Sequence, residues 1–422
     1  MKPGHKLLAI LFIAGAAARG QDLPAPNGPA AASPAELSIG GTLHYDLHYS
    51  ETAQFGGGQD GQQWSIVSGD AGYANTALRL PFNMQYGGGY GLSWNGPPSA
   101  GNVYQHLMLS QGMVWRSWNL NASDNVSYTF ETPTTGFSGV PGSGEPIGGT
   151  VTTPVTDQTI LAQNTRSLDN FTTIAIGHRL DYATSLSLGG SWGKMIFIDN
   201  NGENSDTLAA NAGLSRRLNA RNSISGQYSF SRFNYGGAYQ ANAAHIAFSQ
   251  GSSAQINFSR QWNPRIVTSV AAGPQWVSSS DSAITPSSTR FSMSVAASDT
   301  FKFGTGGVNY NHGTSAGSGF ILGAESDVVG ANFARRLGKN LNIGFTGSYM
   351  RTAALNSNQA ASAKFGGAQA SRPLGRYFSI FANYTAIGQS SSLLNSTNVL
   401  NSHLQIIGFG IGYSPRETHL KK

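Results

Sequence analysis

The residues of this chain best suited to chemistry are the alternating group His44, Asp46 and His48. Imidazole and carboxylate serve as metal ligands and as acid–base groups. If the segment is a β-strand, all three side chains face the same way, with His44 and Asp46 roughly 6.5 Å apart and the two histidines about 13 Å apart. His44 and Asp46 are then close enough to share an ion, but a full site needs ligands from neighbouring strands. Without them the group is a polar wall, and the pattern alone predicts no metal or cofactor.

A second candidate is Ser191, which stands in the string Gly189–Gly193 (GGSWG), a match to the nucleophile-elbow pattern of hydrolases. The elbow requires a sharp turn from a strand into a helix. Here apolar residues alternate on both sides of the string, at Leu188 and Met195, and no helical pattern follows. In a chain with 54 glycines such a match is expected by chance. We therefore predict that the protein is not an enzyme.

Long alternating segments must position these groups. The clearest begins at Leu37: its odd positions up to Tyr49 are apolar or aromatic, except for Gly41, and its even positions are polar. Side chains alternate between the faces of a strand, so one face is apolar and the other polar. At about 3.3 Å per residue, thirteen residues tilted by about 40° cross a bilayer. The same alternation recurs from Leu78, Leu341 and Phe378.

The polar parity of these segments is predicted to line a lumen. In the segment that begins at Leu78, this parity includes Arg79, Asn83 and Gln85. The predicted lumen-lining residues are therefore His44, Asp46, His48, Arg79, Asn83 and Gln85. The segment Trp118–Phe130 breaks the rule, because Asp124 falls on its apolar parity. Either a bulge or a different strand boundary is needed there.

The composition restricts the class of protein further. Only 11% of the residues are charged, against about a quarter in soluble proteins, while 10% are aromatic. The formal charge is +6, and Lys2, Lys6 and Arg19 supply half of it, so no clustered basic face remains and we exclude nucleic acid as a partner. The absence of cysteine excludes thiol chemistry and disulfides.

The first twenty residues have the features of a secretory signal. Lys2 and Lys6 precede the apolar run Leu7–Ala18, and Ala18 and Gly20 are small residues at the expected cleavage positions. Twelve apolar residues are too few to span a bilayer core of roughly 30 Å. We predict a cleaved signal peptide over residues 1–20 and a Pro/Ala-rich periplasmic segment over residues 21–35.

Short, mostly basic segments recur at a spacing of roughly 38 residues, and their length is typical of tight hairpin turns. The predicted short turns are Tyr73–Thr76, Arg116–Asn119, His178–Asp181, Arg216–Arg221, Arg260–Arg265, Asp299–Lys302, Arg335–Asn340 and Arg372–Arg376. Longer loops are predicted between them, at Gly202–Asp206, Ser279–Ser288, Thr314–Gly323 and Glu131–Leu168. The last either enters the lumen as a constriction or lies outside.

Eight short turns predict about eighteen strands, with both termini on the periplasmic side. The fold class is all-β: a transmembrane antiparallel up-and-down barrel of about 18 strands (16–18), with short periplasmic turns and longer external loops. The barrel is predicted over residues 36–413 and a basic tail over residues 414–422.

The last alternating segment is His403–Tyr413. In it Gly408, Ile411 and Tyr413 are in register with the closing-strand signal of Gram-negative outer-membrane proteins, while Ile406 stands where that signal has a polar residue. With the secretory signal and the strand pattern, the chain resembles the porin-like outer-membrane β-barrels. The resemblance implies a place in the bacterial outer membrane, contact with its lipid, and recognition by the barrel-assembly machinery through Gly408, Ile411 and Tyr413.

Three functions remain open at this point. The favoured one is a passive diffusion channel for small polar solutes, weakly selective among ions because its wall is rich in Ser, Asn, Thr and Gln. The second is a structural or surface-interaction barrel linked to polysaccharide or biofilm assembly. The third and least supported is a hydrolase embedded in the barrel. The oligomeric state is not determined by these patterns.

Overall fold

The computed structural model describes residues 41–56, 62–75, 79–94, 102–130, 166–198, 204–236, 248–280, 286–317, 322–338, 340–355, 358, 360–392, 402–415 and 418–419. The signal peptide (residues 1–20) and the Pro/Ala-rich segment (residues 21–35) lie outside these residues and stay predictions. Within the described ranges, no helix has the length and apolar character needed to cross a membrane.

The described chain forms nineteen β-strands, of which the first eighteen contain 12 to 16 residues each. Strands of globular proteins typically have about five or six residues. The bounds are β1 (Thr42–Gly56), β2 (Gln62–Asn75), β3 (Phe82–Ser93), β4 (Asn102–Val114), β5 (Trp118–Phe130), β6 (Arg166–Arg179), β7 (Thr184–Phe197), β8 (Ser205–Arg217), β9 (Asn222–Tyr235), β10 (Phe248–Gln261), β11 (Ile266–Ser279), β12 (Ser288–Phe301), β13 (Gly304–Gly317), β14 (Leu322–Leu337), β15 (Leu341–Ala354), β16 (Ala360–Leu374), β17 (Phe378–Ser391), β18 (Ser402–Tyr413) and β19 (Thr418–His419).

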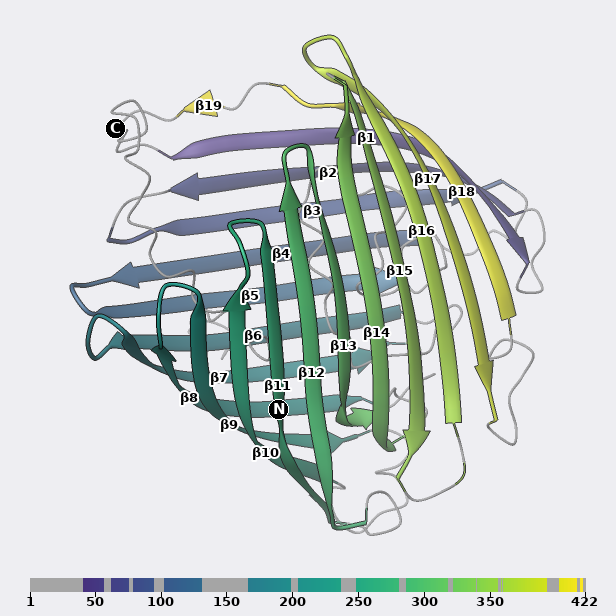
Figure 1. Cartoon of the computed structure of the whole chain (residues 1–422). Helices are drawn as coiled ribbons and strands as arrows, with labels where there is room; N and C mark the ends of the chain where they lie inside the picture. Colours follow the sequence, from purple (N-terminus) through teal and green to yellow (C-terminus); the bar gives the residue numbers. More distant parts are fainter. Residues whose placement is uncertain are drawn as a thin grey trace, which may run out of the picture.

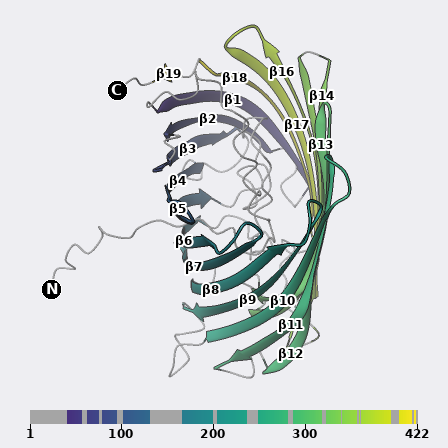
Figure 2. The same cartoon turned by 60° about the vertical axis from the view of Figure 1, so that its left-hand side comes forward.

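The first eighteen strands close into a barrel. Each pairs antiparallel with its neighbours along the chain, and β18 also pairs with β1, from Leu47 opposite Tyr413 to Gly56 opposite Leu404 (Figure 1). Figure 2 shows β2–β6 on one side of the barrel and β13, β14, β16 and β17 on the opposite side. The predicted all-β, up-and-down barrel of about 18 strands is confirmed.

The segment predicted as a basic tail contributes a nineteenth strand. In β19, Thr418 and His419 pair with Leu43 and Thr42 at the beginning of β1. This short strand occupies the edge of β1 that β18 leaves free, since the β1–β18 register begins only at Leu47.

The connections at the two ends of the barrel differ in length. One end of the barrel holds the first residues of β1, and the eight connections there have two to six residues each. The nine connections at the other end have four to thirty-five residues each. Each of the eight predicted short turns overlaps one of the former, but all eight also include residues at the end of a strand: β2, for example, continues to Asn75, beyond the predicted beginning of the turn Tyr73–Thr76. The prediction for Thr314–Gly323 was wrong in extent, because β13 and β14 remain paired as far as Gly317 opposite Leu322. Their backbones pair although glycine and serine residues interrupt the alternation of apolar and polar residues that indicates a strand.

Three of the short turns share one local device. In the turns 180–183, 218–221 and 262–265, the side-chain oxygen of Asp181, Asn219 or Asn263 accepts hydrogen bonds from the backbone N–H groups two and three residues later, at 2.6 to 2.9 Å. Asp and Asn are favoured in turns for this reason. The pKa of the Asp181 carboxyl is lowered by the N–H of Ala183 and then by Thr184, because these hydrogen bonds stabilise the charged form.

The exception at Asp124 is resolved without a bulge. The register between β5 and β6 is continuous from Trp118 to Phe130, so Asp124 stays on the outward parity. Its Oδ1 accepts hydrogen bonds from Thr172 Oγ1 at 2.7 Å and Asn170 Nδ2 at 3.0 Å, both on β6. A carboxylate with two hydrogen-bond donors is far less costly at this face than a bare one. Neither the predicted bulge nor a different boundary is needed.

Candidate functional site in the lumen wall

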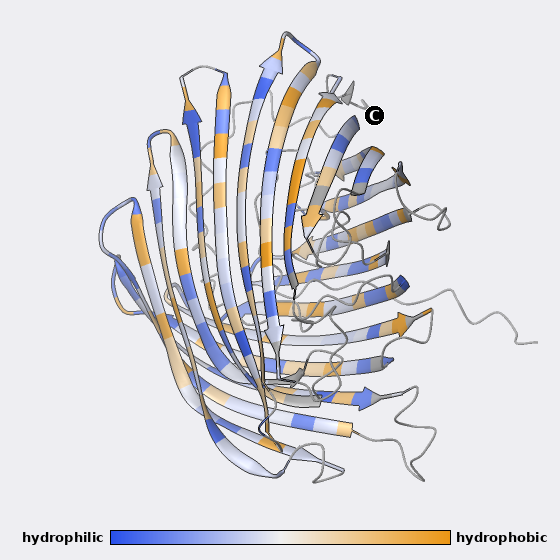
Figure 3. Ribbon diagram, turned by 90° about the vertical axis from the view of Figure 1, so that its right-hand side faces the viewer, coloured by the Kyte–Doolittle hydropathy of each residue, from blue (hydrophilic) through white to orange (hydrophobic). Residues whose placement is uncertain are grey.

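Hydrophilic and hydrophobic residues are interspersed along the strands of the barrel wall (Figure 3). In β1, Leu43, Tyr45 and Leu47 are exposed apolar or aromatic side chains, and Leu47 is 54% exposed, whereas its neighbour His48 is 8% exposed. Alternate residues of a strand point to opposite faces, and in a closed barrel these faces are the outside and the lumen. His44, Asp46 and His48 therefore share the face of β1 opposite to Leu43, Tyr45 and Leu47, and their place in the lumen lining stays a prediction.

The neighbouring strand β2 adds an acid to this group. In the β1–β2 register Asp46 stands directly opposite Asp70. Nε2 of His48 lies 3.8 Å from Oδ1 of Asp70, and Nε2 of His44 lies 3.9 Å from Oδ2 of the same carboxylate. The two histidines, too far apart along one strand to share an ion, thus meet at one carboxylate from the next strand. Asp46, His48 and Asp70 each offer a ligand atom, and these atoms lie within 4.8 Å of one another.

Two glycines make room for the imidazole rings. A Cβ built on Gly72 would lie 2.1 Å from Cε1 of His44, and one built on Gly412 would lie 2.8 Å from Nδ1 of His48. Contacts this short do not occur, so any larger residue at these positions would force the rings to move. Gly72 on β2 and Gly412 on β18 therefore let both rings lie against the wall.

His48 is buried, yet its polar atoms have no hydrogen-bond partner. Both Nδ1 and Nε2 lack one, although the side chain is only 7% exposed. The ring of Phe381 on β17 contacts it edge-on, at 6.1 Å between centroids. Buried polar atoms are nearly always paired, so an unpaired one requires an explanation.

The remaining predicted lumen residues fall in two places. Asn83 and Gln85 lie in β3 on the parity opposite the exposed Met84 and Tyr86, with Gln85 opposite Gly72, so they share the face of Asp46 and Asp70, and their place in the lumen lining stays a prediction. Arg79 precedes β3 and is exposed in the turn 76–81, where its carbonyl oxygen accepts a hydrogen bond from the N–H of Val114. Arg79 thus belongs to the end of the barrel, while Asn83 and Gln85 belong to its wall.

A second polar group occupies a split between β12 and β13, near the longer connections. The β12–β13 pairing ends at Met293 opposite His312, whereas β11–β12 and β13–β14 remain paired beyond that level. The side-chain amide of Gln275, on β11, fills the place of the missing pairing: its Nε2 donates to the carbonyl of Thr314, and its Oε1 accepts from the N–H of Thr314, at 3.0 and 2.9 Å. The amide of one side chain thus substitutes for backbone pairing across the split.

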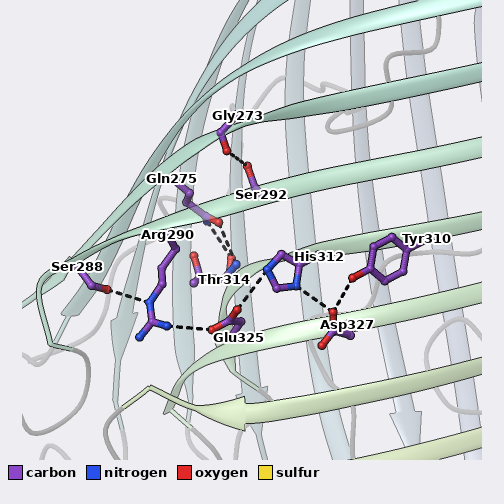
Figure 4. Close-up of polar contacts among 10 residues, drawn as sticks. All are labelled: Gly273, Gln275, Ser288, Arg290, Ser292, Tyr310, His312, Thr314, Glu325 and Asp327. Atoms are coloured by element: carbon purple, nitrogen blue, oxygen red, sulfur yellow. Dashed lines mark hydrogen bonds and ion pairs between the residues drawn. The ribbon is translucent and has the colours of Figure 1, made fainter.

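An ion-pair network crosses the same split (Figure 4). Nη1 of Arg290 lies 3.1 Å from Oε2 of Glu325, and Oε1 of Glu325 lies 3.2 Å from Nε2 of His312. Nδ1 of His312 lies 2.9 Å from Oδ1 of Asp327, which also accepts a hydrogen bond from the Tyr310 hydroxyl at 2.8 Å. Both ring nitrogens of His312 therefore have partners. We call these five residues the seam network.

Ser191 does not lie on an elbow. It stands in the middle of β7, opposite Thr173 on β6 and Ala209 on β8. The strand runs without interruption from Thr184 to Phe197, so the sharp strand-to-helix turn that makes such a serine a nucleophile is missing at this position.

The outer face of the barrel decides what kind of protein this is. Large apolar side chains are exposed on strands all round the wall, among them Val67 on β2, Ile256 on β10 and Phe409 on β18, at 56, 65 and 62%. A closed barrel with such an outward face is stable where hydrocarbon surrounds it. The chain is an outer-membrane β-barrel. Its location in the bacterial outer membrane agrees with the sequence prediction.

No protein-family model matches this sequence, and no curated protein matches it. Among solved structures, the barrel is similar to OccAB4 of Acinetobacter baumannii, at 9% identity and a TM-score of 0.45 over 92% of this chain and 100% of that chain. It is also similar to OccK2 (OpdF) of Pseudomonas aeruginosa, at 10% identity and a TM-score of 0.45 over 89 and 97% of the two chains. The siderophore receptor PirA of Pseudomonas aeruginosa matches at 9% identity and a TM-score of 0.44 over 89 and 80%. The strand pairing itself, independent of these likenesses, establishes the barrel.

The closing strand places the predicted assembly signal at the β1–β18 junction. In β18, Ile411 is exposed on the outer face, and the ring of Tyr413 lies 5.2 Å from that of Phe378 on β17. Ile406, which departs from the signal, is buried beside Leu404 and Ile387. An apolar residue there fits an apolar environment. Recognition of Gly408, Ile411 and Tyr413 by the assembly machinery stays a prediction.

Sequence reasoning missed Asp70 and the whole seam network. Asp70 could have been found by pairing the first two strands as a hairpin, because a connection of five residues places it opposite Asp46. The seam network carried no such signal: its members come from three strands, and the split between β12 and β13 appears only in the pairing.

Proposed function

We propose that this barrel is a passive diffusion channel for small polar solutes. The observation that carries the proposal is the closed barrel of eighteen strands with a polar inner parity. Barrels of 16 to 18 strands enclose more space than side chains can fill, which leaves an aqueous passage. The proposal needs no catalytic group, and Ser191, the one nucleophile that the sequence suggested, lies in mid-strand.

The charges on the described inner wall predict its selectivity. On β1 and β2, nearer the end with the short turns, the wall carries the carboxylates Asp46 and Asp70, and its neighbours on the same face include the uncharged Ser68, Asn83 and Gln85. A wall that is mostly uncharged and polar discriminates weakly among ions, and two carboxylates favour cations slightly. Neutral polar solutes fit such a lining best.

The test is the conductance of the refolded, untagged chain in planar lipid bilayers at several salt concentrations. We expect stepwise openings with a small preference for cations, which falls in the double variant Asp46→Asn/Asp70→Asn. The matched control is Asp206→Asn, because Asp206 pairs with Lys194 on the outward parity, at 3.9 Å, away from the passage. A folded, heat-modifiable barrel that stays electrically silent would overturn the proposal and favour the structural or surface-interaction alternative.

A further inference from the structure

We infer that Asp46, His48 and Asp70 form a binding site for a divalent transition-metal ion in the wall of the barrel. The three residues come from two paired strands and present one imidazole nitrogen and two carboxylate oxygens within 4.8 Å of one another. The inference concerns the wall of the barrel and holds whether or not the lumen conducts.

The unpartnered histidine is the independent observation that points to a ligand. His48 is more than nine-tenths buried, neither ring nitrogen has a hydrogen-bond partner, and Nε2 lies 3.8 Å from Oδ1 of Asp70. That separation is too long for a hydrogen bond. It is close to the separation between two ligands of one tetrahedral ion, roughly 3.3–3.6 Å for metal–ligand bonds of 2.0–2.2 Å. Binding would bring the ligand atoms of the three residues, which lie within 4.8 Å of one another, to that separation.

The charge of the site matches a divalent cation. Asp46 and Asp70 stand directly opposite each other, and like charges in such a pair are destabilising. The neighbouring inner-face positions in the register carry no charge: these are Gly410 and Gly412 on β18 and Gln85 and Gly87 on β3. No lysine or arginine at these positions compensates the pair. One divalent ion neutralises both carboxylates and also uses the free imidazole nitrogen.

The chemistry of the ligands selects the kind of ion. Imidazole suits Zn²⁺, Ni²⁺ and Cu²⁺, whereas Mg²⁺ and Ca²⁺ prefer oxygen ligands alone. His44 adds a second imidazole 3.9 Å from the far oxygen of Asp70, and its side chain is more exposed than that of His48. His44 is therefore placed to take up an ion from the lumen before it reaches the buried ligands.

The test is calorimetric titration of ZnCl₂ into the refolded, untagged chain in a zwitterionic detergent. We expect one zinc ion per barrel, with affinity reduced at least tenfold in Asp70→Asn and in His48→Gln, and no binding of MgCl₂ or CaCl₂. The matched control is His312→Gln: His312 also lies between two carboxylates, but both of its ring nitrogens have partners, so this variant should bind zinc as the wild type does.

Two results would overturn the inference: no saturable zinc binding by the wild-type barrel, or zinc binding of wild-type affinity in both Asp70→Asn and His48→Gln. Asp46→Asn keeps the test decisive if His48→Gln does not fold, because removing one of two facing charges does not impair the sheet. Heat modifiability on gels identifies the variants that fold. A silent conductance experiment combined with zinc binding would reject the channel and retain the metal site.

Discussion

His48 and His312 each lie beside two carboxylates, but the two regions of the wall satisfy their polar groups to different extents. Both ring nitrogens of His312 lie within 3.2 Å of a carboxylate oxygen, and Arg290 and Tyr310 complete the network. Both ring nitrogens of His48 are buried without a partner, and Asp46 and Asp70 face each other without a neighbouring cation in the register. Polar groups that are paired with one another hold the strands together. Polar groups without a partner leave their nitrogen and oxygen atoms available to bind a ligand.

The largest effect should come from zinc. A ligand that binds only the folded barrel, at a hundredfold excess over its dissociation constant, raises the free energy of unfolding by about 2.7 kcal/mol. We expect this increment in the wild type and in His312→Gln, and its loss in His48→Gln, measured by urea unfolding in detergent with and without a chelator. An equal increment in all three proteins would remove the difference between the two regions.

Next in size is the loss of the amide that bridges the split. Gln275→Ala leaves the N–H and the carbonyl of Thr314 without their partner, which should lower the free energy of unfolding by about 2 kcal/mol. The matched control is Gln250→Ala on β10, which loses one hydrogen bond to the Ser278 hydroxyl and should cost about 0.5–1 kcal/mol. If the two variants are equally stable, the split does not depend on Gln275.

Replacing one acid by its amide in the seam network and one in the β1–β2 group should change the free energy of unfolding by a smaller amount, and differently in the two regions. Asp327→Asn weakens the charge-assisted contacts to His312 and Tyr310 and should destabilise the barrel by about 1 kcal/mol. Asp70→Asn relieves the repulsion from Asp46 and, in zinc-free buffer, should leave stability unchanged or raise it by a few tenths of a kcal/mol. Destabilisation by Asp70→Asn as large as that by Asp327→Asn would show that the β1–β2 group is structural.

The smallest effect is expected at Asp181, whose carboxylate accepts hydrogen bonds from the backbone in an exposed turn. Its pKa is lowered in the folded protein, so its contribution to the turn is present above the unfolded value of about 3.9 and is lost as the pH falls through the folded pKa. Asp181→Asn should remove this dependence, because Asn219 and Asn263 hold the equivalent turns with a neutral amide. The measurement is the ratio of hydrogen-exchange rates at Ala183 and Thr184 between the variant and the wild type from pH 5 to pH 2. A ratio that is constant with pH contradicts the prediction.

Much of the fold could be predicted from local patterns. The alternation in segments such as Leu341–Tyr349 predicts long strands with one apolar face, because the side chains of a strand alternate whatever the strand pairs with. The short turns could be found for a similar reason: Asp181 and Asn219 stabilise their turns through backbone groups two and three residues away. The eight predicted short turns, three of which have this device, were enough to predict the number of strands.

Only the tertiary structure decided which polar groups meet. Asp70 reaches His48 because the β1–β2 register places it opposite Asp46, and the fit of His48 against the wall depends on Gly412, more than 360 residues away along the chain. The split between β12 and β13, which Gln275 bridges from β11, leaves no trace in the periodicity of either strand. Alternation is a property of a single strand, whereas register and the split between two strands are properties of strand pairs. Whether a charged side chain of this wall has a partner depends on the neighbouring strands, so the tertiary structure decides it.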